Sequence, residues 1–313
     1  MPVRRTAAIA LLAAAAACAP GPARTPGTPG VRLPGTLVVS AGGTRATVDL
    51  EEYVLGSILA EISPVGESDA TIARVFEVHA VLARTYAATH LGRHRAEGFD
   101  LCDATHCQRY DPGRISRSRF SAAARAAVER TRRLMVLYGG RPAETLYHAD
   151  CGGETAAAED VWGGRVPYLV PIADEVPAMR HRTWQRTIAR RDLAAALNAD
   201  PRTKLAGELV ALSIDAQDAS GRAARLTIAD DRGTTRTTTG EIFRTIVNRS
   251  LASPGLQSTR FAIANRGAVF VFDGSGFGHG VGLCQVGALA RARRGDTLEA
   301  ILGAYYPDIR IGR

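Results

Sequence analysis

Three cysteine and histidine side chains fall close together in the stretch LCDATHCQRY, which runs from residue 101 to residue 110. The three side chains, those of Cys102, His106 and Cys107, fall within a window of six positions. Two thiolates and an imidazole are zinc ligands, and a fourth ligand or a water would complete a tetrahedral site. A Cys102–Cys107 disulfide closing a short loop is also sterically possible. Spacing alone leaves a metal site, a disulfide and free thiols as open alternatives.

A carboxylate that could act as a general acid is Glu61, in the stretch SILAEISP. The pattern places it in the last turn of a helix, beside Leu59 and Ile62. The negative end of the helix dipole and apolar neighbours both disfavour the ionised carboxylate, so the pKa of Glu61 should be raised. A raised pKa suits a general acid at neutral pH. An exposed glutamate near a helix end is the structural alternative.

A glycine-dense segment near the C-terminus, GSGFGHGVGLCQVGALARA (274–292), contains His279. It fits neither nucleotide-binding glycine motif, so we interpret it as a tight turn or a close approach of backbone to a ligand. The stretch 147–169 is loop-rich and carries Tyr147, Trp162 and Tyr168, whose rings could stack on sugars or fill a core. Cys151 and Cys284, one in each of these stretches, could pair with each other.

Three helices are expected in the first half of the chain, and they must help to position these groups. The first begins at Asp49, which can cap it with Glu52 at the reciprocal capping-box position, and ends before Pro64. The second covers about 70–91, and a third covers about 121–133. The stretches 134–138 and 144–150 read as paired strands around Gly139–Gly140. From 183 to 272 short strands alternate with two short helices. We therefore predict an α+β fold with N-terminal helices, mostly antiparallel strands and a β-rich middle insertion.

The N-terminus predicts export. Arg4 and Arg5 precede an apolar stretch too short to span a bilayer, and small residues follow up to Cys18. The ending AAAC resembles a bacterial lipobox with Cys18 as the lipidated residue, although Ala15 replaces the usual leucine. We expect residues 1–18 to be an export signal and 19–35, rich in Pro and Gly, to be a tether. The protein would then be periplasmic or at the cell surface, with its only membrane attachment a lipid on Cys18.

The charge of the chain narrows the choice of partner. The formal net charge is +8, and Lys204 is the only lysine among 39 basic residues. Removal of Arg4 and Arg5 with the signal lowers the net charge to +6. A basic surface favours an acidic partner such as a carboxylate-bearing wall polymer. No basic run is interleaved with aromatic residues, which argues against nucleic acid.

Five stretches, in this order, resemble the SpoIID/LytB family of exported cell-wall proteins. They are LEEYVLGSILAEISP from Leu50, VHAVLARTYAATH from Val78, LCDATHCQRY, YHADCGGETAAAEDVWGGRVPYL from Tyr147, and GFGHGVGLCQVGALARA followed by ILGAYYP. Each one is weak evidence singly, but five in order are highly specific. The segment from about 183 to 272 carries no such motif.

The resemblance implies one SpoIID-like catalytic domain over 36–313 that acts on peptidoglycan. The family's sporulation members are lytic transglycosylases that cut glycan strands lacking stem peptides. Their catalytic glutamate lies in an Ala-Glu-Met-Pro stretch, which matches Ala60–Glu61 here. This sequence departs from that pattern, because Ile62 replaces the methionine and Ser63 is inserted before Pro64. The resemblance thus implies Glu61 as the catalytic residue.

Further residues are implied by the same resemblance. Zinc is expected at Cys102, His106 and Cys107, in a structural role. The side chains expected to bind glycan are Tyr147, Trp162, Tyr168 and His279.

The implied reaction uses one carboxylate twice. Protonated Glu61 would donate to the glycosidic oxygen between N-acetylmuramic acid and N-acetylglucosamine. The sugar's C6 hydroxyl would attack C1 and pass its proton to Glu61, leaving a 1,6-anhydro end. A hydrolase would instead need two carboxylates at a defined separation. Glu67, Asp69 and Glu154 are the possible second groups.

Two other functions compete with the transglycosylase. One is a non-catalytic peptidoglycan binder that modulates a wall amidase, as LytB-type relatives do; the inserted Ser63 favours it. The other is a zinc amidase that cuts the stem peptide, which would need an open metal site beside the cleft.

Overall fold

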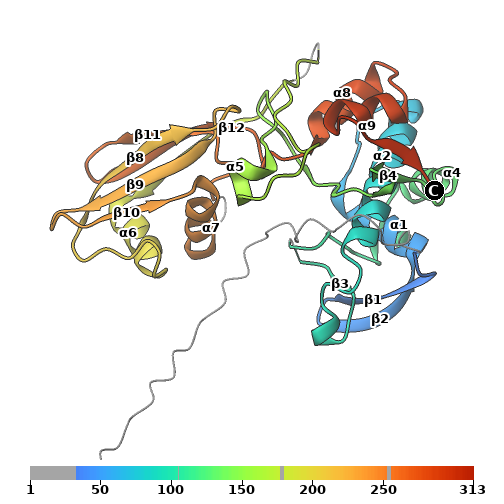
Figure 1. The fold of residues 1–313 in the computed structure, drawn as a ribbon, viewed down its shortest axis with the longest axis horizontal. Coiled ribbons are helices and arrows are strands. Elements are labelled where there is room, and N and C mark those ends of the chain that lie inside the picture. Colours follow the sequence, from blue (N-terminus) through green and yellow to red (C-terminus); the bar gives the residue numbers. More distant parts are fainter. Residues whose placement is uncertain (1–32, 105, 177–179, 252–254) are drawn as a thin grey trace, which may run out of the picture.

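The computed structural model describes residues 33–104, 106–176, 180–251 and 255–313. The predicted signal, Cys18 and most of the predicted tether lie outside these residues. The described chain forms two lobes that are joined by loops and by the short helix α5 (Ala158–Trp162), as Figure 1 shows. In these ranges, none of the helices has both the length and the apolar character that a membrane crossing requires.

The larger lobe begins with the hairpin of β1 (Thr36–Ala41) and β2 (Thr44–Asp49). Helix α1 (Leu50–Glu61) follows at once, and Asp49 caps it by accepting hydrogen bonds from the backbone N–H groups of Glu51 and Glu52 at 2.8 and 3.3 Å. The predicted start of this helix is therefore confirmed. The Glu52 carboxylate pairs with Arg125 rather than closing a capping box.

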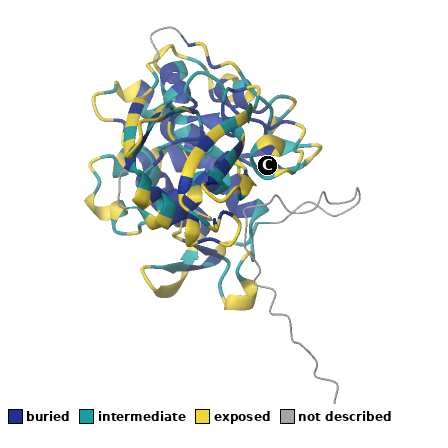
Figure 2. Ribbon diagram, turned by 90° about the vertical axis from the view of Figure 1, so that its left-hand side faces the viewer, coloured by how far each residue is buried: buried dark blue, intermediate teal, exposed yellow. Residues whose placement is uncertain are grey.

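Helix α2 (Asp69–Thr89) is the central element of this lobe and packs against α1, α4 (Ser121–Arg130), α8 (Gln285–Arg293) and α9 (Leu298–Tyr305). Its core residues include Phe76, Val78 and Leu82, which are fully buried. Figure 2 shows buried segments concentrated inside and exposed ones at the rim. Along the chain, α2 and α4 are separated by three smaller elements: the 3-10 turn η1 (Arg95–Glu97), β3 (Leu101–Cys102) and α3 (Arg114–Arg117).

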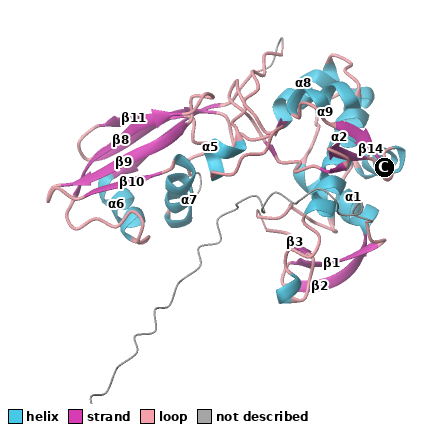
Figure 3. Ribbon diagram, viewed as in Figure 1, coloured by secondary structure: helices cyan, strands magenta, loops and turns pink. Residues whose placement is uncertain are grey.

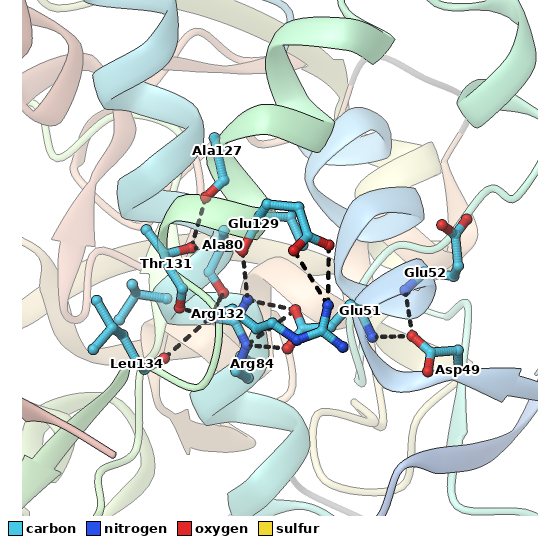
Figure 4. A network of polar contacts seen from close by, with 12 residues as sticks. Asp49, Glu51, Glu52, Ala80, Arg84, Ala127, Glu129, Thr131, Arg132 and Leu134 are labelled. Atoms are coloured by element: carbon cyan, nitrogen blue, oxygen red, sulfur yellow. Dashed lines mark hydrogen bonds and ion pairs between the residues drawn. The ribbon is translucent and has the colours of Figure 1, made fainter.

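An arginine holds α1 against the neighbouring helices (Figure 4). The Arg84 side chain of α2 is fully buried, and its Nε and Nη2 atoms bind the Glu51 carboxylate of α1 at 2.5 to 3.2 Å. Its Nη1 atom donates to the carbonyls of Thr131 and Leu134 at 3.0 and 3.1 Å. One guanidinium thus ties α1 to α2 and to the chain that leaves α4.

The prediction that 134–138 pairs with 144–150 is wrong. Strand β4 (Met135–Tyr138) pairs with β5 (Arg141–Pro142) and with the C-terminal β14 (Arg310–Gly312). Gly139 and Gly140 both have positive φ, so they form a two-residue turn and the returning strand starts at once. Strand β6 (Tyr147–His148) instead lies parallel to β13 (Leu283–Cys284), which places it beside the glycine-dense segment.

The smaller lobe contains two three-stranded antiparallel sheets. One sheet contains β8 (Leu209–Gln217), β9 (Ala223–Asp230) and β10 (Thr235–Thr238). The other contains β11 (Phe261–Asn265), β12 (Val269–Ser275) and β7 (Thr183–Ala189). Helices α6 (Arg190–Asn198) and α7 (Gly240–Ser250) pack against them, as Figure 3 shows. The lobe has its own hydrophobic cluster, which includes Phe243, Phe270 and Phe272.

Together the two lobes form the predicted α+β fold, in which most strand pairs are antiparallel. Arg222 connects the lobes, since it is only 1% exposed and its guanidinium donates to the backbone carbonyls of Cys151 and Glu154 at 2.7 and 2.9 Å. These loops approach the glycine-dense segment, where the candidate site lies.

Candidate functional site

A cavity of about 380 Å³ lies where the end of α1, strand β6, helix α5 and the glycine-dense segment meet. This volume is in the range of small-ligand sites. Its lining includes Glu61, His106, Cys107, Tyr147, Trp162 and His279 among the residues singled out from the sequence. The fold therefore brings together side chains that are up to 218 positions apart in the chain.

Glu61 is the last residue of α1 and points its carboxylate into this cavity. Burial raises the pKa of Glu61, although the Arg109 backbone N–H, which donates to Oε1 at 3.1 Å, and the Tyr147 hydroxyl oppose the shift. The inserted Ser63 lies in the exposed loop after the helix and leaves Glu61 at the helix end. The site thus holds a carboxyl that keeps its proton to higher pH than usual and has two donors ready for its ionised form.

A second carboxylate, Glu144, lines the same cavity and was not singled out from the sequence. Burial raises its pKa too, and its Oε2 atom lies 3.5 Å from Nε2 of His90. The three second carboxylates considered from the sequence do not line this cavity. Glu67 pairs with Arg293, Asp69 starts α2, and Glu154 lines a separate polar pocket.

A backbone hydrogen bond fixes the tautomer of His279. Its Nδ1 atom accepts from the Val281 N–H at 3.1 Å, so the proton of the neutral ring is on Nε2. Burial, with the charges of Arg244 and Arg222, lowers the pKa of His279 to about 3, so the ring stays neutral. The ring of His279 therefore keeps its one N–H group on Nε2 and stays uncharged in the cavity lining.

Glycine is required where this segment passes β6. Gly282 has φ +72°, and a Cβ there would lie 2.0 Å from the Leu146 carbonyl oxygen. Gly278 has φ +105°, and its Cβ would lie 2.9 Å from Cβ of His148. The absence of side chains lets the segment lie directly against the strand that carries Tyr147 and His148.

The aromatic residues differ in their placement. Tyr147 and Trp162 line the cavity, and the Trp162 ring lies 5.1 Å from that of His279. Tyr168 does not line it: the side chain is buried beside Tyr138, and its hydroxyl accepts from the Glu144 N–H at 2.7 Å. Tyr168 therefore supports the backbone of Glu144 rather than facing a ligand.

A cluster that can hold a metal forms where η1 and β3 meet, next to the cavity. It contains the three predicted ligands, Cys102, His106 and Cys107, and adds His94. The Nε2 atom of His94 lies 3.2 Å from Nε2 of His106, 3.3 Å from Sγ of Cys107 and 3.7 Å from Sγ of Cys102. Two thiols and two imidazoles at such mutual distances fit a tetrahedral zinc site.

A carboxylate orients the added ligand. The Nδ1 atom of His94 lies 2.6 Å from the Glu97 carboxylate, an arrangement common behind metal-binding histidines. His94 was missed because it precedes Cys102 by eight residues, outside the short Cys/His run. His106 and Cys107 shortly precede Arg109, whose backbone N–H donates to the Glu61 carboxylate. The cluster therefore also holds in place the chain segment that contacts Glu61.

The four cysteines of the described chain are all free thiols. Cys102 and Cys107 belong to the metal cluster. Cys151 and Cys284 are fully buried neighbours, with the Cys151 N–H donating to Sγ of Cys284 at 3.2 Å. The fold thus brings together the two cysteines whose pairing the sequence left open.

Two family models match parts of this chain. The family model described as Stage II sporulation protein matches residues 41–138, and a domain family of unknown function matches 177–282. An uncharacterized protein of Brachyspira hyodysenteriae is 30% identical over 267 residues, covering 84% of this chain and 67% of the relative.

Two relatives from Bacillus subtilis carry functional names. The protein named Stage II sporulation protein D is 24% identical over 285 residues, covering 87% of this chain and 77% of that protein. The protein named Amidase enhancer is 26% identical over 270 residues, covering 72% of this chain. The match covers only 36% of the Amidase enhancer's length.

Proposed function

The chain belongs to the SpoIID/LytB family of cell-wall proteins, and we propose that it is a peptidoglycan lytic transglycosylase with Glu61 as general acid and base. The observation that carries this proposal is a carboxyl of raised pKa at the end of α1, aimed into a ligand-sized cavity. The expected partner is the glycan strand of peptidoglycan. An export signal with a lipid on Cys18 would keep the activity on the wall side of the membrane.

The surroundings of Glu61 suit a carboxyl that cycles between two protonation states. Burial favours the neutral form, which can donate its proton to the glycosidic oxygen between N-acetylmuramic acid and N-acetylglucosamine. After donation, the Arg109 N–H and the Tyr147 hydroxyl stabilise the carboxylate. That carboxylate can then take the proton of the C6 hydroxyl as this oxygen attacks C1, which leaves a 1,6-anhydro end.

We further propose that His94, Cys102, His106 and Cys107 hold a zinc ion. Four protein ligands are typical of closed structural zinc sites. When bound, zinc would supply a crosslink between η1 and the segment after β3, which positions the Arg109 N–H against Glu61.

The proposal is tested by mass spectrometry of digests of intact and amidase-stripped sacculi. The protein should release fragments with 1,6-anhydro ends, one water lighter than hydrolysis products. Glu61→Gln should abolish release. Glu67→Gln is the matched control, because it removes a carboxylate outside the cavity. Unchanged release by Glu61→Gln would reject the assignment.

Glu144→Gln separates the two cleavage mechanisms, because Glu144 is the other carboxylate in the cavity lining. A transglycosylase that uses Glu61 alone should keep releasing anhydro ends in this variant. Loss of release in both variants, with hydrated products from the unmodified protein, would indicate a two-carboxylate hydrolase instead.

A second candidate function is the modulation of a wall amidase without glycan cleavage. The similarity to the protein named Amidase enhancer favours it. In that case the protein would bind glycan strands and raise the rate of a purified wall amidase. It would release no sugar, and Glu61→Gln would leave the stimulation unchanged.

A further inference from the structure

Glu144 gives the cavity a second carboxyl that the proposed chemistry at Glu61 does not use. Its side chain is 25% exposed, so it stays accessible to a ligand in the cavity that it lines. Among the described residues, its only ion-pair contact is with His90, whose Nε2 atom lies 3.5 Å from Oε2, and none of them donates a hydrogen bond to the carboxylate. Most of the acceptor capacity of this carboxyl is therefore unused within the described chain.

The contact with His90 holds one proton. Nδ1 of His90 lies 3.1 Å from the Tyr86 carbonyl oxygen, which only accepts, so Nδ1 carries the ring proton. Burial, with the charge of Arg93, lowers the pKa of His90 to about 4, so Nε2 is an unprotonated acceptor at neutral pH. Burial raises the pKa of Glu144, although the charge of Arg93 opposes this shift. Two acceptors attract each other only with a proton between them, so Oε2 is occupied by His90 and Oε1 is left as an acceptor for a ligand.

The backbone around Glu144 is held in place. Its N–H donates to the Tyr168 hydroxyl at 2.7 Å, and the hydroxyl of the buried Thr145 donates to a backbone carbonyl of α2 at 3.0 Å. Three residues after Glu144, the Tyr147 hydroxyl contacts the Glu61 carboxylate. Three residues of chain span at most about 11 Å. A glycan that reaches Glu61 can therefore also contact the fixed carboxyl of Glu144.

Sugar hydroxyl and acetamido N–H groups donate hydrogen bonds, and a carboxyl oxygen with open lone pairs accepts them. We propose that Oε1 of Glu144 accepts a hydrogen bond from a hydroxyl or acetamido N–H group of the glycan and so positions the strand against Glu61. The inference rests on the proposed function in that the ligand is a glycan, but it holds whether or not the strand is cut. Glu144 is then a binding residue and transfers no proton to the glycan.

Glycan affinity, measured by isothermal titration calorimetry, is the direct test. The probes are an N-acetylglucosamine tetramer and glycan strands without stem peptides, added to the Glu61→Gln protein so that nothing is cleaved. Adding Glu144→Leu should weaken binding about 5- to 10-fold, the worth of one hydrogen bond. Equal affinity with and without Glu144→Leu would overturn the inference.

Glu144→Gln separates the loss of a hydrogen bond from the loss of a side chain. Its amide N–H group can donate to Nε2 of His90, which leaves the amide oxygen as an acceptor for the sugar. It should therefore keep most of the affinity that Glu144→Leu loses. An affinity as low as that of Glu144→Leu would contradict the role of an acceptor.

Glu154→Leu is the matched control, because Glu154 lines the separate polar pocket and not the cavity. In the same background it should bind both probes as the Glu61→Gln protein does. Thermal unfolding of both leucine variants checks that the fold is kept. An equal loss of affinity in both leucine variants would mean a general effect of the substitution instead of a contact, and would overturn the inference.

Steady-state kinetics of the protein with Glu61 intact give a second readout. The contact is made by the bound glycan and is kept during the reaction, so Glu144→Leu should raise KM and leave kcat nearly unchanged. A lower kcat at unchanged KM would instead place Glu144 in the bond-breaking step and contradict a binding role.

The two proposals fail separately. Weaker binding by Glu144→Leu, without anhydro products from the unmodified protein, would reject the transglycosylase and keep the glycan contact. Anhydro products with unchanged affinity of Glu144→Leu would do the reverse.

Discussion

Replacing Arg84 with methionine removes the charge that ties α1 to its neighbours while keeping a long apolar side chain. The variant leaves the Glu51 carboxylate, whose side chain is 13% exposed, without its cation. It also leaves the carbonyls of Thr131 and Leu134 without the donor that Arg84 supplies. We expect a large loss of stability, because these groups are turned away from water.

The size of this loss can be worked from the contacts. Breaking one partner of a buried ion pair costs about 3–5 kcal/mol. In the double variant Arg84→Met/Glu51→Leu no buried charge is left alone, and the main remaining loss is two carbonyl hydrogen bonds, at about 1 kcal/mol each. Arg84→Met loses the same two bonds, so the difference between the variants is the cost of the unpaired charge. The double variant should therefore be about 3–5 kcal/mol more stable than Arg84→Met, and the two changes should not add.

Urea unfolding measures these differences. The chain has two tryptophans, Trp162 near the cavity and Trp184 in the smaller lobe. With Trp184→Phe as background, fluorescence reports the larger lobe. Arg130→Met is the matched control, because Arg130 also joins α4 to α2, by its pair with Glu77, but its side chain is 50% exposed. An exposed pair of this kind is worth about 0–1 kcal/mol.

Two results would refute the reasoning. One is an Arg84→Met variant that loses no more stability than Arg130→Met. The other is a double variant whose loss equals the sum of the single losses, since that would mean that Arg84 and Glu51 do not depend on each other.

Three further predictions concern the site. His94→Ala should reduce bound zinc, measured by elemental analysis, to a trace, whereas Cys151→Ser should retain it; full retention by His94→Ala would exclude it as a ligand. Because burial raises the folded-state pKa of Glu61, this carboxyl destabilises the fold increasingly as the pH rises above its ordinary pKa, and the penalty is complete above the folded-state pKa. Glu61→Gln should therefore melt higher than the unmodified protein at about pH 8, with no such gain at about pH 4; a gain independent of pH would contradict this cause. Gly282→Ala should cost more than about 1 kcal/mol, because its φ is +72° and its Cβ would meet the Leu146 carbonyl, whereas Gly303→Ala in α9, with open space around it, should gain up to about 1 kcal/mol; equal effects in thermal unfolding would argue against the close approach.

Features that depend on residues close together in the chain could be predicted from the sequence alone. Asp49 caps a helix because its carboxylate reaches the N–H groups two and three residues on, a contact that depends only on neighbours in the chain. The same helix ends at Glu61, and the direction of its pKa shift follows from apolar neighbours that the sequence already shows. The short spacing of Cys102, His106 and Cys107 likewise places three possible ligands together.

Contacts between segments that are distant in the chain could not be predicted from the sequence. The partner predicted for the strand at 147–148 was wrong. The chain turns back after two residues, so β4 pairs with β5, and β6 pairs with β13, which lies 136 residues further along the chain. His94 joins the metal cluster only because η1 folds back onto β3. Tyr168 was expected at a ligand, but the packing of Tyr138 against it turns it into the core.

The sequence by itself determined the α+β class, the family, the helix that ends in Glu61 and three of the four residues that cluster as possible metal ligands, because each depends on residue types at short spacing. Only the tertiary structure decided that Glu61 shares a cavity with Glu144, that the Val281 N–H fixes the tautomer of His279, and that His94 joins the cysteine and histidine cluster. Burial and hydrogen-bond partners arise from segments far apart in the chain, and no local pattern encodes which of them will meet.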